Sequence, residues 1–325
     1  MDEQIALQIQ KAVDLINSSE IICFPTETVY GLGADGCRDD AVAKIYKTKG
    51  RPSDNPLIVH ADSLESISQI AEINEYAEKI AENFWPGPIS LVLKLKKPSR
   101  ISSLVTAGLD TVCVRIPKNE IAISIIKNSK KYIAAPSANL SNYVSPTEYL
   151  HVKEAFPNLF VIDGGKCVYG IESTILDLSN DTPTILRHGF ITEDVIEDIL
   201  KTKIIIPEKI PQNQNKIIAP GMKLKHYSPN AKLIRLRDFG FNEKSKKFVA
   251  IDFGKSNILN AEFSLNLSLE SDLIEAAANL YSMMRMGDEI CSKNDIEFIV
   301  IADIPNVGIG MAINDKIDRA KYQNS

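Results

Sequence analysis

The chain of 325 residues has few cysteines and a single tryptophan. Its five cysteines are an odd number, they are widely scattered, and no two of them form a C-x-x-C pair. This pattern argues against a disulfide framework and against a structural zinc site. No stretch approaches the roughly 18 apolar residues that a membrane span needs, and the N-terminus is acidic where a signal peptide would be basic. We therefore expect a cytoplasmic protein that does not enter a membrane.

An overall excess of basic residues is also absent, although the charge is unevenly distributed. Residues 1–200 carry a net charge of −8, residues 201–230 carry +5 and residues 231–325 carry −2. Phosphate neutralisation normally supplies most of the affinity for nucleic acids. The acidic main body therefore argues against a protein whose main role is to bind nucleic acid, whereas the short basic segment suits a smaller phosphate ligand.

Apolar periodicity predicts an α/β domain with a mixed sheet over residues 1–206. Helices are expected over 3–18, 39–49, 63–71, 74–84, 119–129 and 191–200. Asp39 or Asp40 is expected near the N-cap of the second helix and Gly50 just past its end, and the last helix is expected to have a capped start. Strands are expected at 21–24, 57–60, 89–95, 111–117, 132–136, 159–163, 173–178 and 183–189.

A linker and a second domain are expected to follow. Residues 207–229 contain four prolines and little periodicity, which is typical of a linker. Residues 230–325 alternate strands and helices and predict a smaller parallel α/β domain. Its strands are expected at 231–236, 246–253 and 297–303, and its helices near 270–287 and from about 310.

The stretch FPTETVYGLGADG (24–36) contains the spacing G-x-G-x-x-G at Gly31, Gly33 and Gly36. In dinucleotide-binding folds these glycines follow a strand closely and open a helix that binds pyrophosphate. Here TETVY intervenes and the helix begins near Asp39, so the context argues against that fold. No G-x-x-x-x-G-K-[ST] motif is present either, and a nucleotide would need a different binding loop.

Basic residues surround the loop KTKGRPSDNP, which joins two buried elements. We interpret Lys47 as a complement to the helix dipole. Lys49 and Arg51 lie in the part shaped by Gly and Pro, where an ammonium and a rigid guanidinium fork can hold a polyphosphate. Asn55 follows one turn later.

Two polar residues interrupt apolar strands. His60 ends LIVH, and a single histidine at a strand end is more often structural than catalytic. Arg115 lies in TVCVRIP, where a buried cation without an anion is costly. Its partner is either an internal carboxylate or the carboxylate of a ligand, and the sequence leaves both open.

Further polar residues follow other strands. Ser137 and Asn139 of APSANLSN either cap the next helix or lie at the carboxyl end of a strand, where open α/β folds bind ligands. Ser145 and Ser173 suit helix N-caps, and Arg187 places another cation at a strand end. Polar clusters at several strand ends favour one shared site.

The chain resembles the threonylcarbamoyl-AMP synthases in their long form. That form has a YrdC-like domain with an open twisted mixed sheet, a linker, and a smaller Rossmann-like parallel α/β domain. The resemblance rests on motifs that occur in the same order and spacing: FPTETVYGLG, KGRPSDNPLIVH, FWPGP, TVCVRIP, APSAN, GIESTILD, ILRHG, APGMKLKHYSP and the tail GIGMAINDKIDRA.

The resemblance implies a nucleotidyltransferase that converts L-threonine, bicarbonate and ATP to threonylcarbamoyl-AMP and pyrophosphate. Mg²⁺ is expected with the triphosphate, and no protein ligand for it is identified. A separate threonylcarbamoyl-transferase complex then modifies the tRNA adenosine beside the anticodon, so direct tRNA binding by this chain is not required. Positioning and electrostatics, rather than a covalent nucleophile, would drive the reaction.

Site residues follow from matching positions in the resemblance. The threonine side comprises Thr28, His60, Arg115, Ala135 and Ser173. The ATP side comprises Lys49, Arg51, Asn55, Thr111, Ser137, Asn139, Ser145, Arg187 and Tyr227, with Lys49 and Arg51 as the catalytic cations. The glycines of 24–36 are expected to let the backbone approach the ligand. The linker at 207–229 is expected to form a lid that brings Tyr227 to the nucleotide.

Two positions depart from the resemblance. Asn142 stands where Gly is usual, which is tolerable because Asn also adopts left-handed conformations. His188 replaces a Pro after Arg187, and this change is expected to loosen the orientation of that arginine.

Two other functions are considered for the chain. One is a non-catalytic RNA-binding YrdC-like module. The other is a carbamoyl-phosphate-using maturation factor, which would need zinc fingers that these cysteines cannot build.

Overall fold

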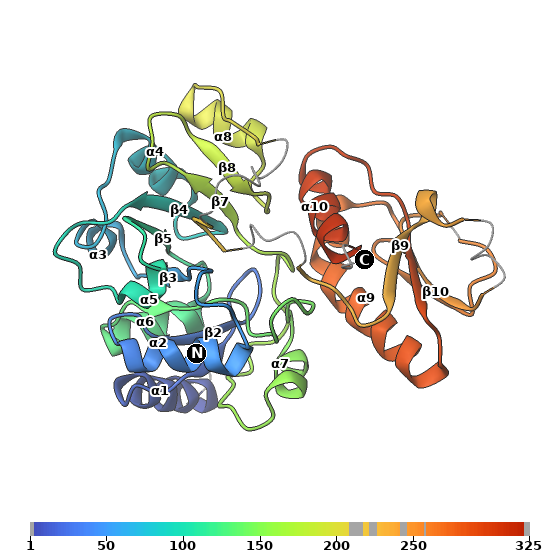
Figure 1. Ribbon diagram of the computed structural model, residues 1–325, viewed down its shortest axis with the longest axis horizontal. Coiled ribbons are helices and arrows are strands. Elements are labelled where there is room, and N and C mark those ends of the chain that lie inside the picture. Colours follow the sequence, from blue (N-terminus) through green and yellow to red (C-terminus); the bar gives the residue numbers. More distant parts are fainter. Residues whose placement is uncertain (1–2, 208–216, 221–225, 241–245, 257, 322–325) are drawn as a thin grey trace.

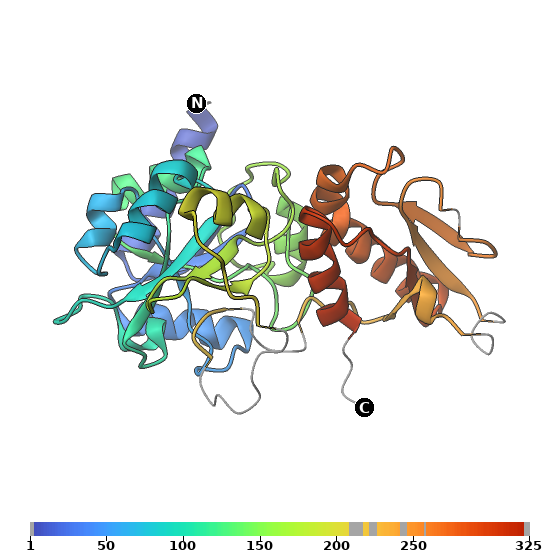
Figure 2. The ribbon, with the colours of Figure 1, turned by 90° about the horizontal axis from the view of Figure 1, so that it is seen from above.

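The chain folds into two α/β bodies that lie side by side in the computed structural model (Figures 1 and 2). The structure describes residues 3–207, 217–220, 226–240, 246–256 and 258–321. None of the helices in these ranges combines the length and the apolar character that crossing a bilayer requires.

The first body is built on an eight-stranded sheet. Its strands are β1 (Ile22–Phe24), β2 (Gly31–Asp35), β3 (Ile58–His60), β4 (Ile89–Lys94), β5 (Thr111–Arg115), β6 (Ile133–Ala134), β7 (Thr174–Asp177) and β8 (Thr184–Arg187). They lie in the order β1-β2-β6-β3-β5-β4-β7-β8. The pairs β3/β5 and β4/β7 are parallel and the other neighbours are antiparallel, so the predicted mixed sheet is confirmed.

Eight helices of the described residues cover this sheet. They are α1 (Glu3–Asn17), α2 (Asp39–Lys49), α3 (Leu64–Ser68), α4 (Glu75–Phe84), α5 (Ser103–Thr106), α6 (Glu120–Ser129), α7 (Tyr149–Ala155) and α8 (Glu193–Leu200). The short helices α5 and α7 were not predicted. Asp39 and Asp40 lie in the first turn of α2, beside its N-cap at Arg38, and Gly50 ends the helix in the left-handed conformation as expected.

Other details of the first body also differ from the predictions. Strand β2, which pairs with β1 and β6, was not predicted. The strand expected at 159–163 is reduced to a single bridge between Val161 and Cys23. Helix α8 starts after Thr192, but its hydroxyl binds the Asp194 carboxylate instead of capping a backbone amide. The predicted side-chain cap, in which this oxygen would accept from a backbone amide, is therefore absent.

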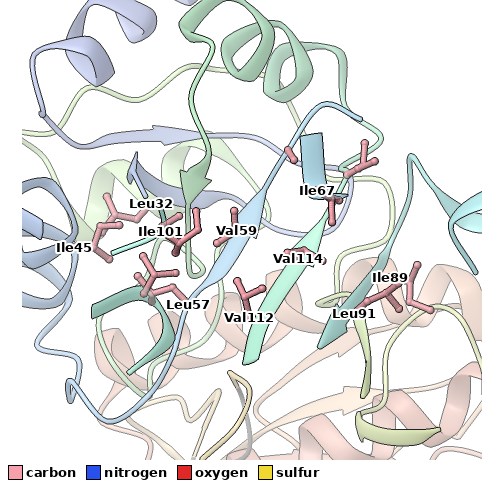
Figure 3. Close-up of a cluster of buried hydrophobic side chains, with 14 of the residues drawn as sticks. Leu32, Ile45, Leu57, Val59, Ile67, Ile89, Leu91, Ile101, Val112 and Val114 are labelled. Atoms are coloured by element: carbon pink, nitrogen blue, oxygen red, sulfur yellow. The ribbon is translucent and has the colours of Figure 1, made fainter. Parts of the chain in front are cut away.

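Alternation along the strands divides the apolar residues between the two faces of the sheet. In β1, Cys23 points to a large cluster, whereas Ile22 and Phe24 pack beneath α1 and α6. Figure 3 shows the large cluster around Val59 and Val114 of the central strands. Each fully buried side chain of this size stabilises the fold by about 1.5–3 kcal/mol. The cores on both faces hold the strand ends in fixed positions.

The second body has a four-stranded sheet in the order β11-β10-β12-β9, and every pair is parallel. The predicted parallel α/β domain is therefore confirmed. Helix α9 is longer than the predicted 270–287, and the edge strand β11 was not predicted. The elements are β9 (Lys232–Arg235), the 3-10 turn η1 (Leu236–Asp238), β10 (Phe248–Asp252), β11 (Phe263–Asn266), α9 (Leu273–Asn294), β12 (Phe298–Ile301) and α10 (Ile309–Lys321).

Helices α9 and α10 lie on the side of the second body that faces the first (Figures 1 and 2). At Gly170 the two bodies approach at the level of the main chain. This glycine has a φ of +67°, and a Cβ added to it would lie 2.5 Å from the carbonyl oxygen of Ala278. Glycine meets both requirements of this position. Most of the predicted linker, residues 208–216 and 221–225, lies outside the described residues.

Candidate active site

Side chains from separate strand ends line one cavity. His60 ends β3 and Arg115 ends β5, and the two residues are direct partners in the parallel pairing of these strands. Predicted site residues that line the cavity are Thr28, Arg51, His60, Arg115, Ala135, Ser137, Ser173 and Arg187. The cavity is also lined by Thr26, Val29, Gly31, Ile58, Pro136, Glu172, Pro220 and His226.

Arg115 is held by three groups of the protein. Its Nε donates to Gly87 O at 3.1 Å and its Nη1 donates to Thr28 Oγ1 at 3.0 Å. Its Nη2 forms an ion pair with Glu27 Oε1 at 2.6 Å. Of the two partners that the sequence left open, the structure contains the internal carboxylate. A guanidinium fixed on three sides keeps a single orientation in the cavity.

His60 is a neutral imidazole at physiological pH. Burial and, secondarily, the charge of Arg115 lower the pKa of His60 to about 3. Its Nδ1 lies 3.3 Å from the carbonyl oxygen of Ile133, which can only accept. Because a neutral imidazole has one donor and one acceptor, this contact assigns the proton to Nδ1 and leaves Nε2 as an acceptor.

Arg187 is fixed by Ser173, which lies on the neighbouring strand segment. Its Nε donates to Ser173 O and its Nη2 to Ser173 Oγ, both at 3.0 Å. The Ser173 hydroxyl also shares a hydrogen bond of 2.8 Å with Ser90. These bonds hold Arg187, although it is followed by His188 instead of the Pro that the resemblance led us to expect. Asn142 adopts a φ of 68°, so the left-handed conformation expected there is present.

Arg51 and Lys49 have different surroundings. Arg51 lines the cavity, and its Nη2 donates to Asn55 Oδ1 at 2.6 Å and to Pro56 O at 2.8 Å. Lys49 is buried behind the wall, where its Nζ donates to the carbonyl oxygens of Ser137 and Asn139, both at 2.5 Å. Asn55 therefore orients Arg51, and Lys49 holds together the loop that follows β6.

Several predicted ATP-side residues lie outside the cavity lining. Thr111 begins β5, at the opposite end of the strand from Arg115. Ser145 is buried and donates to Glu172 Oε1 at 2.5 Å. Tyr227 is buried between the two bodies, and within the described residues its hydroxyl has no hydrogen-bond partner. None of these three residues is part of the cavity lining, and Thr111 is the one set apart by the length of a strand.

Sequence reasoning missed three residues of the site. Glu27 and Glu172 stand directly before Thr28 and Ser173, the residues that the motifs brought to attention. His226 precedes Tyr227 and lines the cavity. A carboxylate within an otherwise apolar, Gly-rich or Ser-rich motif was the available signal for both glutamates, because such a group is costly to bury without a cation or donors.

The cavity carries a positive potential. Burial and then the charges of Arg51, Lys49 and Arg187 lower the pKa of His226 well below its ordinary value. Burial lowers the pKa of Arg51 to about 10, and Arg187 adds to this shift. Neighbouring cations of this kind form a ready site for an anionic ligand.

The glycines of the opening motif make room for an aromatic ring. A Cβ on Gly33 would lie 2.6 Å from Phe24 Cε1 and 2.9 Å from Ile133 Cγ2. Gly31 also abuts Phe24, and it alone of the two lines the cavity. The expectation that the glycines serve ligand approach is therefore wrong for Gly33, which lies in β2 against the core.

Comparisons with known proteins agree with this architecture. The family described as "Telomere recombination", that of Sua5, YciO and YrdC, matches residues 14–189. The family described as "Threonylcarbamoyl-AMP synthase, C-terminal domain" matches residues 191–321. Threonylcarbamoyl-AMP synthases from Bacillus subtilis and Pyrococcus abyssi are each 38% identical to this chain over 329 residues. The alignments cover 96% of this chain and 92% and 94% of those proteins, respectively.

Solved structures show the same arrangement of both bodies. Pyrococcus abyssi Sua5 complexed with L-threonine has a TM-score of 0.87 and 36% identity, and the match covers 96% of this chain and 94% of that one. A variant of that protein, in which adjacent histidine and tyrosine residues are replaced by alanine, also has a TM-score of 0.87. The chain belongs to the threonylcarbamoyl-AMP synthase family, in the form that carries the additional C-terminal domain.

Proposed function

We propose that the protein joins L-threonine, bicarbonate and ATP to form L-threonylcarbamoyl-AMP, pyrophosphate and water, and is thus a nucleotidyltransferase. One observation carries the proposal: three arginines, Arg51, Arg115 and Arg187, meet His60 and Ser173 in a single cavity. Both substrates of the adenylation step are anions, so they need such a positive site. The relatives from Bacillus subtilis and Pyrococcus abyssi bear the name of this synthase.

Threonine is proposed to bind at Thr28, His60, Arg115, Ala135 and Ser173. The pre-oriented guanidinium of Arg115 suits the amino-acid carboxylate, and Nε2 of His60 can accept from the threonine hydroxyl or ammonium. The Pyrococcus abyssi relative was solved with L-threonine. That complex is a property of the relative, and it supports our proposal that the cavity of the present chain binds an amino acid.

ATP is proposed to bind on the side of Arg51 and Arg187. The full set comprises Lys49, Arg51, Asn55, Thr111, Ser137, Asn139, Ser145, Arg187 and Tyr227. Lys49 acts here through the main chain of Ser137 and Asn139, and Arg51 supplies the guanidinium that contacts the phosphates. His226 and Tyr227 form the only His-Tyr pair in the sequence, near the C-terminal end of the linker.

The chemistry follows from these positions. The threonine amine takes up bicarbonate as a carbamate with loss of water, and a carbamate oxygen attacks the α-phosphorus of ATP. The bond from that phosphorus to the bridging oxygen breaks, and pyrophosphate leaves with the electron pair. Arg51 and Arg187 would offset the charge that accumulates on the phosphates, and Arg115 would hold the amino acid in line.

Mg²⁺ is proposed to arrive with the nucleotide. Among the described residues, no three His, Cys, Asp or Glu side chains group together as a metal site. Triphosphate oxygens and water are ligands that Mg²⁺ prefers. The donor set of the described protein residues therefore does not fit a resident ion, and no step of the reaction is assigned to one.

The chemistry of the product indicates which kind of enzyme must act next. A mixed anhydride of a carbamate and AMP is labile, so a threonylcarbamoyl-transferase complex must consume it and modify the tRNA adenosine. We place these reactions in the cytoplasm. The proposed parts of the chain are a catalytic domain at 1–206, a linker or lid at 207–229 and a C-terminal domain at 230–325.

A non-catalytic RNA-binding module is the other candidate function. The net charge of −8 over residues 1–200 disfavours it.

The test is pyrophosphate release from ATP by the purified full chain, with threonine or bicarbonate omitted in turn and the adenylate detected by mass. Both products are expected only when all three substrates are present. Arg51→Ala should lower kcat/KM on the order of 100-fold. Lys47→Ala is the matched control, because Lys47 is an exposed cation in the last turn of α2, the helix that ends just before Arg51. Adenylate absent under every combination would refute the enzyme, and salt-dependent tRNA binding would then support the RNA-binding module.

A further inference from the structure

One face of helix α9, from the second body, is bonded to a short segment of the first body that carries Ser145. The Thr147 and Ser282 hydroxyls share a hydrogen bond of 2.9 Å, and Arg285 Nη2 donates to Val144 O at 2.5 Å. At the end of this segment, the Tyr143 hydroxyl donates to Asp288 Oδ2 at 2.7 Å. The spacing of the α9 residues places them on one side of the helix.

A further residue of this face, Tyr281, reaches the site itself. Its hydroxyl donates to Glu172 Oε2 at 2.6 Å. The other oxygen of that carboxylate, Oε1, accepts from Ser145 Oγ at 2.5 Å. Glu172 thus joins a residue of the second body to a residue proposed to bind ATP. All three side chains are buried, so both hydrogen bonds are shielded from water.

Tyr281 is suited to remain a donor in this arrangement. Burial, and after it the Glu172 charge, raise the pKa of Tyr281 well above its ordinary value. The phenol is therefore protonated throughout the working pH range, and it can donate without exchanging a proton. The Tyr281 ring also lies against the ring of Tyr227, with 5.4 Å between the centroids.

A second residue of the same body, Lys316, also bonds to the first body close to the site. Lys316 on α10 is fully buried and donates from Nζ to the carbonyl oxygen of His188 at 2.5 Å. Burial lowers the pKa of Lys316, and the charges of Asp315, its ion-pair partner at 3.0 Å, and then of Glu172 oppose this effect. Two buried residues of the second body, Tyr281 and Lys316, thus bond to Glu172 and to the main chain beside Arg187.

We propose that Tyr281 is a positioning residue of the active site, through which the C-terminal domain orients Glu172 and Ser145 for ATP. The proposal rests on the function proposed above for the cavity. It gives the second body a part in nucleotide binding through its folded α9, in addition to anything the linker does. Tyr281 does not line the cavity, and its hydroxyl acts through Glu172.

The test compares Tyr281→Phe with Tyr143→Phe. Each substitution removes one phenol hydroxyl that binds a carboxylate across the junction, and each keeps the aromatic ring in place. Only the first hydroxyl is linked to Glu172. Tyr281→Phe should raise the Kd for ATP and the KM for ATP about tenfold or more, the size expected when a charged acceptor loses its donor. Tyr143→Phe should leave both within about twofold of the wild type.

Glu172→Gln approaches the same link from the first body. It should raise the Kd for ATP as Tyr281→Phe does, and the double variant should be no weaker than the worse single variant, because the two residues act as a unit. The KM for threonine should change little in each. Equal Kd values for ATP in Tyr281→Phe and Tyr143→Phe, with similar losses in Tm, would reduce Tyr281 to a structural contact and overturn the proposal.

These readouts separate the inference from the proposed function. Adenylate formation by the wild type tests the reaction, whereas the ratio of ATP Kd values between the two tyrosine variants tests the positioning role and needs no turnover. If the wild type binds ATP but forms no adenylate, the proposed reaction is refuted, and the Kd values for ATP of the two tyrosine variants still test the role of Tyr281. A wild type that does not bind ATP would overturn both.

Discussion

Glu27 Oε1 lies 2.6 Å from Arg115 Nη2, and both side chains are only 4% exposed. The pair shows how the protein keeps a cation inside an apolar strand before any substrate carboxylate arrives. Because water cannot solvate either partner, each depends on the other. The same pair explains why Thr28, which follows Glu27, is within reach of the Arg115 guanidinium.

Glu27→Gln should lower the free energy of unfolding by about 3–5 kcal/mol, because it leaves a buried guanidinium without its counter-charge. Urea unfolding measures this loss. Asp198→Asn serves as the control, since it breaks a pair with Lys201 in which both side chains are 77% exposed. That variant should unfold like the wild type, and a loss equal to that of Glu27→Gln would contradict the importance of burial.

Arg115→Lys should raise the KM for threonine about 100-fold and leave the affinity for ATP nearly unchanged. Lysine keeps the positive charge beside Glu27, but it lacks the fork that can contact Gly87, Thr28 and a ligand carboxylate together. Steady-state kinetics and ATP binding to the same preparation provide the measurement. Equal losses for both substrates would remove Arg115 from the threonine side.

His60 should make the protein less stable in acid. Its pKa is about 3 when folded and 6.5 when unfolded, so between these values the unfolded chain binds more protons and stability falls as the pH falls. From pH 8 to pH 5 this one group should cost about 2 kcal/mol. His60→Gln should lose that much less over the same range in urea titrations. Identical pH slopes for the two proteins would mean that His60 titrates normally.

Gly33→Ala should destabilise the protein by about 1–3 kcal/mol through overpacking against Phe24 and Ile133. Gly31→Ala offers a close comparison, since its added Cβ would lie 3.3 Å from Phe24 Cζ instead of 2.6 Å from Cε1. Thermal unfolding should therefore rank Gly33→Ala well below Gly31→Ala. The reverse order would show that the ring of Phe24 moves freely.

Local patterns in the sequence were sufficient for the fold class, for most of the elements and for the residues at strand ends. His60, Arg115 and Arg187 each interrupt or end an apolar strand, and parallel and antiparallel pairing then brings such ends together. The strand expected at 159–163 failed because pairing, which a local pattern does not contain, reduces it to one bridge. The unpredicted β11 has exposed residues at its start and lacks the alternation that would indicate a strand.

Contacts between distant segments were beyond the sequence. Lys49 was expected to contact phosphate, but its ammonium lies on two carbonyl oxygens nearly 90 residues away. Glu172 was missed because one of its two partners, Tyr281, belongs to another domain. Periodicity identifies the apolar face of α9, yet it does not reveal which surface that helix meets. Long-range side-chain pairing therefore requires the structure.

The absence of a side chain at Gly170 sets the width of the gap between the two domains. The carbonyl oxygen of Ala278 is only 2.5 Å from where a Cβ would stand, so any other residue there would clash with it and act as a wedge between the domains. A wedge two residues before Glu172 would pull its carboxylate away from Tyr281 while leaving both domains folded. The alignment of the nucleotide end of the cavity thus depends on a close backbone approach at Gly170 as well as on the side-chain hydrogen bonds across the junction.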